Sequence, residues 1–314
     1  MSRCERPLGM SWHDYDEALI ERGCAILDLD SLTSWKEELD AMNRDKLGRP
    51  YEFPNSYISF LAFMKVGFDI PYRTVEGIVR ELSEYVRFVE EIHYTHMRRR
   101  ILALMKGKKP SELVREDDEN NDNDDDEPIT VIVDSSGLST TNKGSYIEDK
   151  WKKEKRKYVK LHLVADKKTK KIVGFRVTSE KTGDSKKFIP LVKDVVKRKR
   201  KVAKAYADRA YDARKNFNLL REEKIEPAIR LRKNAITRSL GSPLRREEAV
   251  LVKKLGYEGW KELKDYGKRW LVEIVFSSFK RVLGDTLRSK KFLSQKAEAS
   301  LKVMLYNRFL SIHP

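Results

Sequence analysis

Apolar positions recur at helical spacing in the first third of the chain. Two such runs, residues 55–68 and 73–86, flank a tight turn at residues 69–71. Together they predict a helix-turn-helix, a motif whose second helix can enter a major groove. Two packed helices that touch no DNA fit the same pattern. Further helices are expected at residues 34–43 and 92–105, whereas the rest of residues 1–50 has weak periodicity.

From residue 129 onward the pattern changes to short β-branched runs alternating with amphipathic segments. Strands are predicted at residues 129–133, 158–165, 172–177, 201–207 and 225–229. Helices are predicted at residues 185–199, 212–223, 266–283 and 297–310, with an irregular segment up to about residue 263. This order is that of a ribonuclease H-like fold. The predicted class is therefore mixed α/β, a ribonuclease H-like catalytic core preceded by a helical region that contains the helix-turn-helix.

An acidic segment separates these two regions. Of the 12 residues from 116 to 127, 9 are Asp or Glu. Like charges repel and nothing apolar is present to fold, which predicts a disordered linker. A calcium loop fits poorly, because the required Gly and the closing Glu are not both in register. The domains predicted are a DNA-binding region at 1–113, the linker at 114–128 and a catalytic domain at 129–314. As a further hypothesis, the acidic tether occupies the DNA channel as a decoy until DNA displaces it.

The charge is distributed unevenly along the chain. The formal net charge is +17, yet residues 1–127 hold 18 Lys+Arg against 28 Asp+Glu, and residues 128–314 hold 48 against 21. A basic field of this size favours a nucleic acid partner, because each neutralised phosphate releases counterions. A lysine-rich, merely solvated surface remains the alternative. Lysines at 150–160 and 186–201 are expected to contribute diffuse phosphate contacts.

Several classes of protein are disfavoured. The two cysteines, Cys4 and Cys24, are too few and too N-terminal for a disulfide framework or a zinc site. No apolar run approaches the length of a membrane span, and acidic residues interrupt the N-terminus where a signal peptide would be apolar. We expect no membrane association and a reducing, cytoplasmic location in contact with the nucleoid.

Three carboxylates form the candidate active site. Asp134 and Asp208 each follow a predicted buried strand, and carboxyl ends of strands are where ligands gather in open sheets. Two neighbouring carboxylates repel each other unless a cation lies between them. Glu273, on a later helix, can complete the cage. Ligands of oxygen alone suit Mg²⁺, with Mn²⁺ as a substitute, and two ions can assist in-line displacement at phosphorus.

The helix that carries Glu273 is the most specific signal. Tyr266, Arg269, Glu273 and Lys280 follow one another at spacings of 3, 4 and 7 residues, which puts them on one sector of a helix. Arg269 and Lys280 can then hold phosphates beside the metal ions. Without the two aspartates, the same charges would be ordinary salt bridges.

With these residues, the chain resembles the insertion-sequence transposases that have an Asp-Asp-Glu catalytic core and a Tyr-Arg-Glu-Lys signature, closest to the insertion-sequence-five group. The resemblance extends over nearly the full chain. It is carried by SWHDY at 11–15, RG at 22–23, PYRTVEG at 71–77, YTHMRR at 94–99, DSSGL at 134–138, KLH at 160–162, ADRAYD at 207–212, RKNA at 232–235 and LYNR at 305–308.

The resemblance implies a cut-and-paste enzyme. Such an enzyme binds terminal inverted repeats and target DNA, pairs two ends as a homodimer or higher oligomer, and uses water and then the freed 3′ hydroxyl as nucleophile. Tyr266, Arg232 and Lys233 are further phosphate-binding candidates, and Arg73, Glu76 and Arg80 are the candidates for end recognition.

Two departures from relatives stand out. Relatives commonly carry Gly after the second aspartate, where this chain has Arg209 and Ala210, and residues 235–263 are short for the strand-rich subdomain that some relatives insert. A ribonuclease H-like nuclease that cuts without joining is the alternative enzyme, and a domesticated DNA-binding regulator is the non-enzymatic one.

Overall fold

The computed structural model describes residues 11–27, 33–87, 89–108, 112–113, 127–140, 158–198 and 201–312. The chain divides into two compact units, Met1–Lys109 with Arg288–Pro314, and Pro110–Leu287. The predicted acidic linker, apart from residues 127 and 128, and the lysines at 150–157 lie outside the described residues. No helix among those described is both long and apolar enough to cross a membrane.

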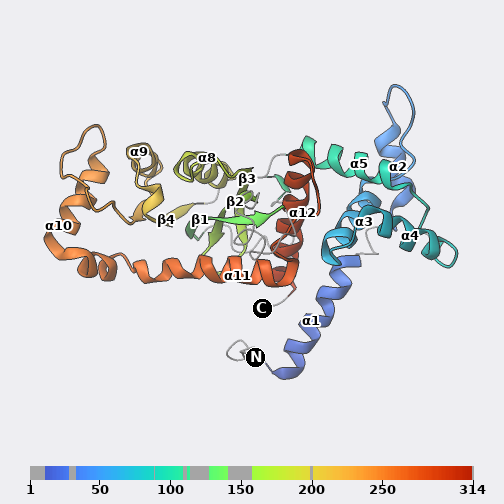
Figure 1. Ribbon diagram of the computed structural model, residues 1–314, viewed down its shortest axis with the longest axis horizontal. Coiled ribbons are helices and arrows are strands. Elements are labelled where there is room, and N and C mark those ends of the chain that lie inside the picture. Colours follow the sequence, from blue (N-terminus) through green and yellow to red (C-terminus); the bar gives the residue numbers. More distant parts are fainter. Residues whose placement is uncertain are drawn as a thin grey trace, which may run out of the picture. The chain divides into compact units, whose positions relative to one another are not determined.

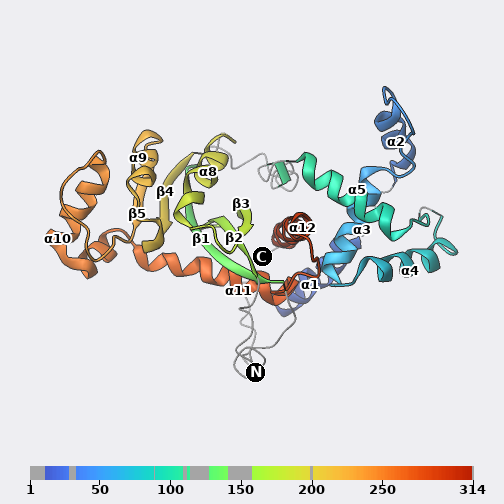
Figure 2. The same ribbon diagram turned by 45° about the horizontal axis from the view of Figure 1, so that its top comes forward.

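The first unit is helical. Its helices are α1 (Trp12–Leu27), α2 (Trp35–Asn43), α3 (Asn55–Gly67), α4 (Tyr72–Ser83), α5 (Tyr94–Gly107) and α12 (Phe292–Ser311). Helix α3 is buried around most of its circumference because α1, α4, α5 and α12 all pack on it. The last helix therefore completes this core (Figures 1 and 2).

The predicted helix pair is present as α3 and α4. The turn between them has Asp69 in the left-handed region, with φ of 47°. Helix α1 was not predicted, because it buries only Ala18 and Ala25 and so has little apolar periodicity. The sequence placed residues 129–314 in one domain, whereas α12 packs with α3 and α5 of the helical unit.

The second unit is built on a five-stranded mixed sheet of order β3-β2-β1-β4-β5. The strands are β1 (Ile129–Ser139), β2 (Tyr158–Asp166), β3 (Ile172–Ser179), β4 (Val202–Ala207) and β5 (Glu226–Ile229). The first three form an antiparallel meander, and β4 and β5 run parallel to β1. The mixed α/β, ribonuclease H-like organisation expected from the sequence is confirmed.

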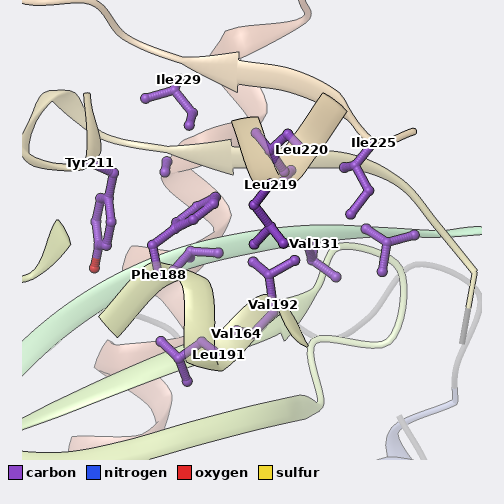
Figure 3. Close-up of a cluster of buried hydrophobic side chains, with 14 of the residues drawn as sticks. Val131, Val164, Phe188, Leu191, Val192, Tyr211, Leu219, Leu220, Ile225 and Ile229 are labelled. Atoms are coloured by element: carbon purple, nitrogen blue, oxygen red, sulfur yellow. The ribbon is translucent and has the colours of Figure 1, made fainter. Parts of the chain in front are cut away.

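Helices cover both faces of this sheet (Figure 1). On one face, α8 (Ser185–Val196) and α9 (Arg214–Glu222) bury the main apolar cluster, in which Phe188, Leu191 and Leu220 meet Val131 and Val164 (Figure 3). On the other face, α11 (Leu271–Leu283) contacts β1. Alternation along β1 therefore sends every second side chain toward α11.

Two elements differ from the sequence prediction. Strand β1 continues through Asp134 to Ser139, because its second half pairs with β2 after its pairing with β4 has ended. The segment expected to be irregular contains α10 (Pro243–Leu263), a helix with Pro at its first turn and a break at Gly256, where φ is 73°. Proline favours a helix start, and only glycine adopts that φ without strain.

Candidate active site

The register of two parallel strands brings the two aspartates together. Val133 pairs with Ala207 in the last rung of the β1–β4 ladder. Asp134 is the next residue of β1 and Asp208 is the first residue after β4, so the two aspartates lie at the same level of neighbouring strands. The sequence predicted Asp134 to follow its strand, whereas it lies within β1. It still lies at the end of the parallel ladder, and that position is what aligns the pair.

Local backbone groups orient both carboxylates. The backbone N–H of Ser135 donates to Asp134 Oδ1 at 2.8 Å. The backbone N–H of Ala210 donates to Asp208 Oδ1 at 2.8 Å, which caps the short 3₁₀ helix η2 (Arg209–Tyr211). The Asp208 side chain is therefore held by a backbone group. Arg209 and Ala210, which stand where relatives commonly carry Gly, still provide this contact.

Arg269 connects the first aspartate with the glutamate. Its guanidinium donates to Asp134 Oδ2 at 3.2 Å and to Glu273 Oε1 at 2.8 Å. Arg269 belongs to the 3₁₀ turn η3 (Tyr266–Trp270), and Glu273 to the first turn of α11, so the spacing of four residues puts them side by side. The Glu273 side chain is 64% exposed and has room to reorient.

The carboxylates repel one another in this setting. Burial raises the pKa of Asp134, and the charges of Asp208 and Glu273 raise it further, against the opposing effects of the Ser135 N–H and Arg269. Burial alone would lower the pKa of Arg269, but Tyr266 and the three carboxylates raise it above its usual value. One guanidinium thus neutralises part of a three-carboxylate site, and a negative charge remains.

The donor set fits a hard divalent cation. All three candidate ligands are carboxylates, which suit Mg²⁺ or Mn²⁺ better than softer metals. Within the part of the chain that the structure describes, no three His, Cys, Asp or Glu side chains are grouped closely enough to hold an ion. The cation that the structure places between Asp134 and Glu273 is the guanidinium of Arg269, which is hydrogen-bonded to both.

The other residues of the signature reach β1 and β4. Lys280 Nζ donates to Ser136 Oγ at 2.7 Å, two residues beyond Asp134. The Tyr266 ring is buried, and its hydroxyl donates to the Ala207 carbonyl at 3.1 Å, immediately before Asp208. As placed, Tyr266 holds the end of β4 and does not face a phosphate-accessible surface.

Arg232 and Lys233 lie together in a basic pocket that follows β5. The pocket has a volume of about 430 Å³, and Arg209, Arg230 and Lys253 also line it. Tyr257 and Trp260 of α10 form part of its wall, with the Arg230 guanidinium 4.5 Å from the Tyr257 ring centroid. Its described lining includes no carboxylate, so the pocket favours an anion.

The three residues predicted to read DNA ends are placed differently from one another. Glu76 accepts the backbone N–H of Tyr94 at 2.9 Å and so caps α5, and Arg80 forms ion pairs with Glu76 at 3.0 Å and Glu91 at 3.7 Å. Arg73 lies over the Tyr94 ring at 4.8 Å. Among the described residues, Arg73 has no carboxylate partner.

Two residues near the site were given no role from the sequence. The Tyr211 side chain is buried, and burial, then the charges of Asp134, Asp184 and Asp208, raise its pKa, whereas the neighbouring Ser135 side chain opposes the shift. Asp212 is buried, receives two hydrogen bonds from Arg245 and one from the Arg232 backbone N–H, and thereby ties η2 to the basic pocket. Both lie in the motif at 207–212, but Arg245 is too distant in sequence for spacing to reveal the partnership.

Comparison with protein families gives two matches. Residues 125–308, more than half of the 314, match a family model described as a transposase DDE domain. Residues 20–143 match a second model of the same description. The first match contains all three carboxylates and the helix that begins after Arg269.

Proposed function

As a member of the transposase DDE family, this chain is a DNA transposase that cleaves DNA and transfers strands, and we propose that Asp134, Asp208 and Glu273 are its catalytic carboxylates. The observation that carries the proposal is the β1–β4 register, which aligns Asp134 with Asp208, together with Arg269, which joins Asp134 to Glu273. The three acids are far apart in the sequence, but in the structure their charges act on one another and on Arg269.

The reaction proposed is cut-and-paste transposition of an insertion sequence. Water attacks a phosphorus at the element's end, the P–O3′ bond breaks, and the departing oxygen becomes a 3′ hydroxyl. That hydroxyl then attacks a phosphorus in target DNA and displaces a second 3′ oxygen. Hydrolysis replaces the 3′ oxygen on phosphorus with the oxygen of water and leaves a 5′ phosphate, and strand transfer replaces one 3′ oxygen with another. Neither step changes an oxidation state, so no oxidant is required.

The family depends on a divalent metal, and we propose two Mg²⁺ ions, replaceable by Mn²⁺, held by the same three carboxylates. When bound, such ions activate the attacking oxygen and stabilise the leaving one. The raised pKa of Asp134, caused first by burial and then by the charges of Asp208 and Glu273, supports this assignment, since a bound cation would stabilise the charged carboxylate. Arg269 is hydrogen-bonded to Asp134 and Glu273, and if these carboxylates held the ions, its guanidinium would be available for a phosphate.

Contacts with DNA phosphates are proposed for four cations of the second unit. Arg269 and Lys280 lie beside the carboxylates, and Arg232 and Lys233 lie in the basic pocket. Tyr266 is proposed to act one step removed, because its hydroxyl bond to Ala207 positions the strand end that carries Asp208. The lysines of α8 add a diffuse attraction.

Recognition of the terminal inverted repeats is proposed for the α3–α4 helix-turn-helix. Arg73 supports it best, since Glu76 and Arg80 engage each other in the free protein. Pairing of two ends by a homodimer or larger assembly, and action at the nucleoid, complete the proposal.

A strand-transfer assay tests the proposal. The substrates are flanking-element junctions with a 3′-hydroxyl donor end, a supercoiled target and Mg²⁺. We expect joined products from the parent protein, and a decrease in cleavage and joining of at least about a hundredfold in Asp208→Asn and Glu273→Gln, as expected when charge stabilisation at phosphorus is removed. DNA binding without metal should remain.

Glu258→Gln is the matched control. Glu258 is an exposed acid of α10 that pairs with Lys261 at 3.3 Å. It should cut and join like the parent. Normal activity in Asp208→Asn would refute the carboxylate assignment, and cleaved products without joined ones would indicate a nuclease.

A further inference from the structure

The cations of the helical unit fall into two groups by their partners. Arg80 is bound to two carboxylates, and Arg288 makes two hydrogen bonds with Asp69, at 2.9 and 3.0 Å. Others have no carboxylate partner among the described residues. Arg73 lies against the Tyr94 ring and hydroxyl, and Arg98 donates to Ser294 Oγ at 3.3 Å.

The cations without carboxylate partners follow one another across three helices. Arg73 is in the first turn of α4, and its guanidinium lies on Tyr94 in the first turn of α5. Arg98 is four residues after Tyr94 and so lies on the same side of α5. Arg98 contacts Ser294, which lies in the first turn of α12. Lys290 and Lys291 immediately precede that helix. In both ribbon views α5 and α12 lie next to each other (Figures 1 and 2).

The turn that carries the two lysines is held from within the core. The buried carboxylate of Glu298 accepts the backbone N–H groups of Arg288 and Ser289, both at 3.0 Å, and lies 3.4 Å from the buried ammonium of Lys65. The buried Gln295 amide donates to the carbonyls of Ser289 and Lys290. Fixed backbone beneath exposed ammonium groups is a preorganised arrangement, because the chain need not be ordered when an anion binds.

We infer that Arg73, Arg98, Lys290 and Lys291 form a phosphate-contacting stripe for the backbone of duplex DNA. A row of cations without counter-charges suits a regularly spaced polyanion, since each phosphate contact releases counterions and breaks no existing ion pair. Arg80, in contrast, must give up two carboxylates to do the same. The stripe positions DNA without reading its sequence. The inference rests on the proposed function only in naming the polyanion as DNA.

Its consequence is that both ends of the chain contribute to one DNA-binding surface. The sequence predicted recognition of DNA ends within residues 1–113 and phosphate contacts within the catalytic domain, and it gave Lys290 and Lys291 no role. Two of the four stripe residues come from the C-terminal segment, which the fold places against α5.

The test is the salt dependence of DNA binding by the full-length protein, measured in EDTA with a short duplex of arbitrary sequence. For the parent, log affinity falls linearly with log salt. Lys290→Ala/Lys291→Ala should reduce the steepness of that line by about 1 for each phosphate that the variant no longer neutralises, and Arg98→Ala by a further ~1. Affinity for unrelated duplexes should weaken equally, because no base is read.

Lys36→Ala is the control. Lys36 is exposed on α2 among acidic residues and has no proposed contact with DNA, so its removal should leave the slope unchanged. Because Lys290 and Lys291 are exposed and hold their turn through the backbone, the double variant should keep the parental melting temperature. Any slope change is then not an effect of unfolding.

An unchanged slope in Lys290→Ala/Lys291→Ala overturns the stripe, as does an equal change of slope in Lys36→Ala. Neither outcome bears on the proposed catalytic carboxylates. Asp208→Asn should retain the parental slope while losing strand cleavage, so the stripe and the catalytic proposal fail independently.

Discussion

At the scale of single residues, His162 shows how the core beside the site responds to pH. It is fully buried in β2, its Nε2 pairs with Thr178 Oγ1 at 2.9 Å, and its Nδ1, without a hydrogen-bond partner among the described residues, lies 3.7 Å from Asp184. Burial lowers the pKa of His162 to about 4, with Lys160 and Lys187 adding to the effect and Asp184 opposing it. The imidazole is therefore neutral in the folded protein at pH 7.

This predicts a pH-dependent stability. The unfolded His162 binds a proton near pH 6.5 and the folded one near pH 4, so between these values the unfolded state holds more protons. The stability contributed by keeping His162 neutral is fully present above pH 6.5. As the pH falls toward 4, the free energy of unfolding decreases by about 3 kcal/mol. Urea unfolding of the parent and His162→Gln across this window checks it. The variant should have a flatter pH profile, and parallel profiles would contradict the prediction.

The active-site residues show which roles their types imply and which need partners. An aspartate after a buried strand suggests a ligand site, and that much follows from Asp134 and Asp208 alone. That Tyr266 supports Ala207, and that Glu76 caps α5, follows only from contacts between distant segments. The sequence alone does not distinguish a tyrosine or glutamate that contacts DNA from one that supports a neighbouring segment of the protein.

At the scale of elements, α10 is the clearest difference between the predicted and the observed chain. Its 21 residues have polar positions nearly all round, and only Glu248, Ala249 and Trp260 are buried. Such a helix lacks the one-sided apolar stripe that makes helices recognisable. Its second half is held instead by Trp260, whose indole N–H donates to Glu248 at 2.8 Å.

Replacing Gly256, at the break in α10, should destabilise the protein. Its φ of 73° with ψ of 175° is open to glycine and strained for any side chain, although a Cβ there would meet no atom within 4 Å. Gly256→Ala should therefore lower the free energy of unfolding by about 1–3 kcal/mol through backbone strain alone. Thermal or urea unfolding measures the difference.

Gly77→Ala provides the matched comparison. Gly77 lies inside α4 with no atom near its virtual Cβ and an ordinary helical φ. Alanine there should stabilise by about 0.5–1 kcal/mol. Equal effects at the two glycines would show that the break is not conformationally demanding.

At the scale of the whole molecule, the helical unit is assembled from both ends of the chain. Its C-terminal part is joined to α3 by the Lys65–Glu298 pair, in which each side chain is only 3% exposed. Removing one partner of a buried pair leaves an unpaired charge and costs about 3–5 kcal/mol. Glu298 also holds the turn at residues 288 and 289, so its removal affects the backbone too.

Glu298→Gln should thus destabilise the helical unit selectively. Hydrogen exchange in the full-length variant should accelerate in α3 and α12, while the amides of β1, β2 and β4 keep their protection. Glu91→Gln, which alters an exposed pair at 3.7 Å, should change neither. Uniform acceleration across both units would show that they unfold together.

The sequence by itself determined the mixed α/β class, most strands and helices and the family, and it made Asp134, Asp208 and Glu273 the catalytic candidates. These depend on local alternation of apolar and polar residues, on turn residues and on fixed spacings along one helix, all of which act over a few positions. The register that aligns Asp134 with Asp208, the contact of Arg269 with two acids, and the return of α12 to the helical unit were decided only by the tertiary structure. Each joins segments far apart in the chain, and which partners meet depends on how whole buried faces pack, a quantity that no short stretch of sequence contains.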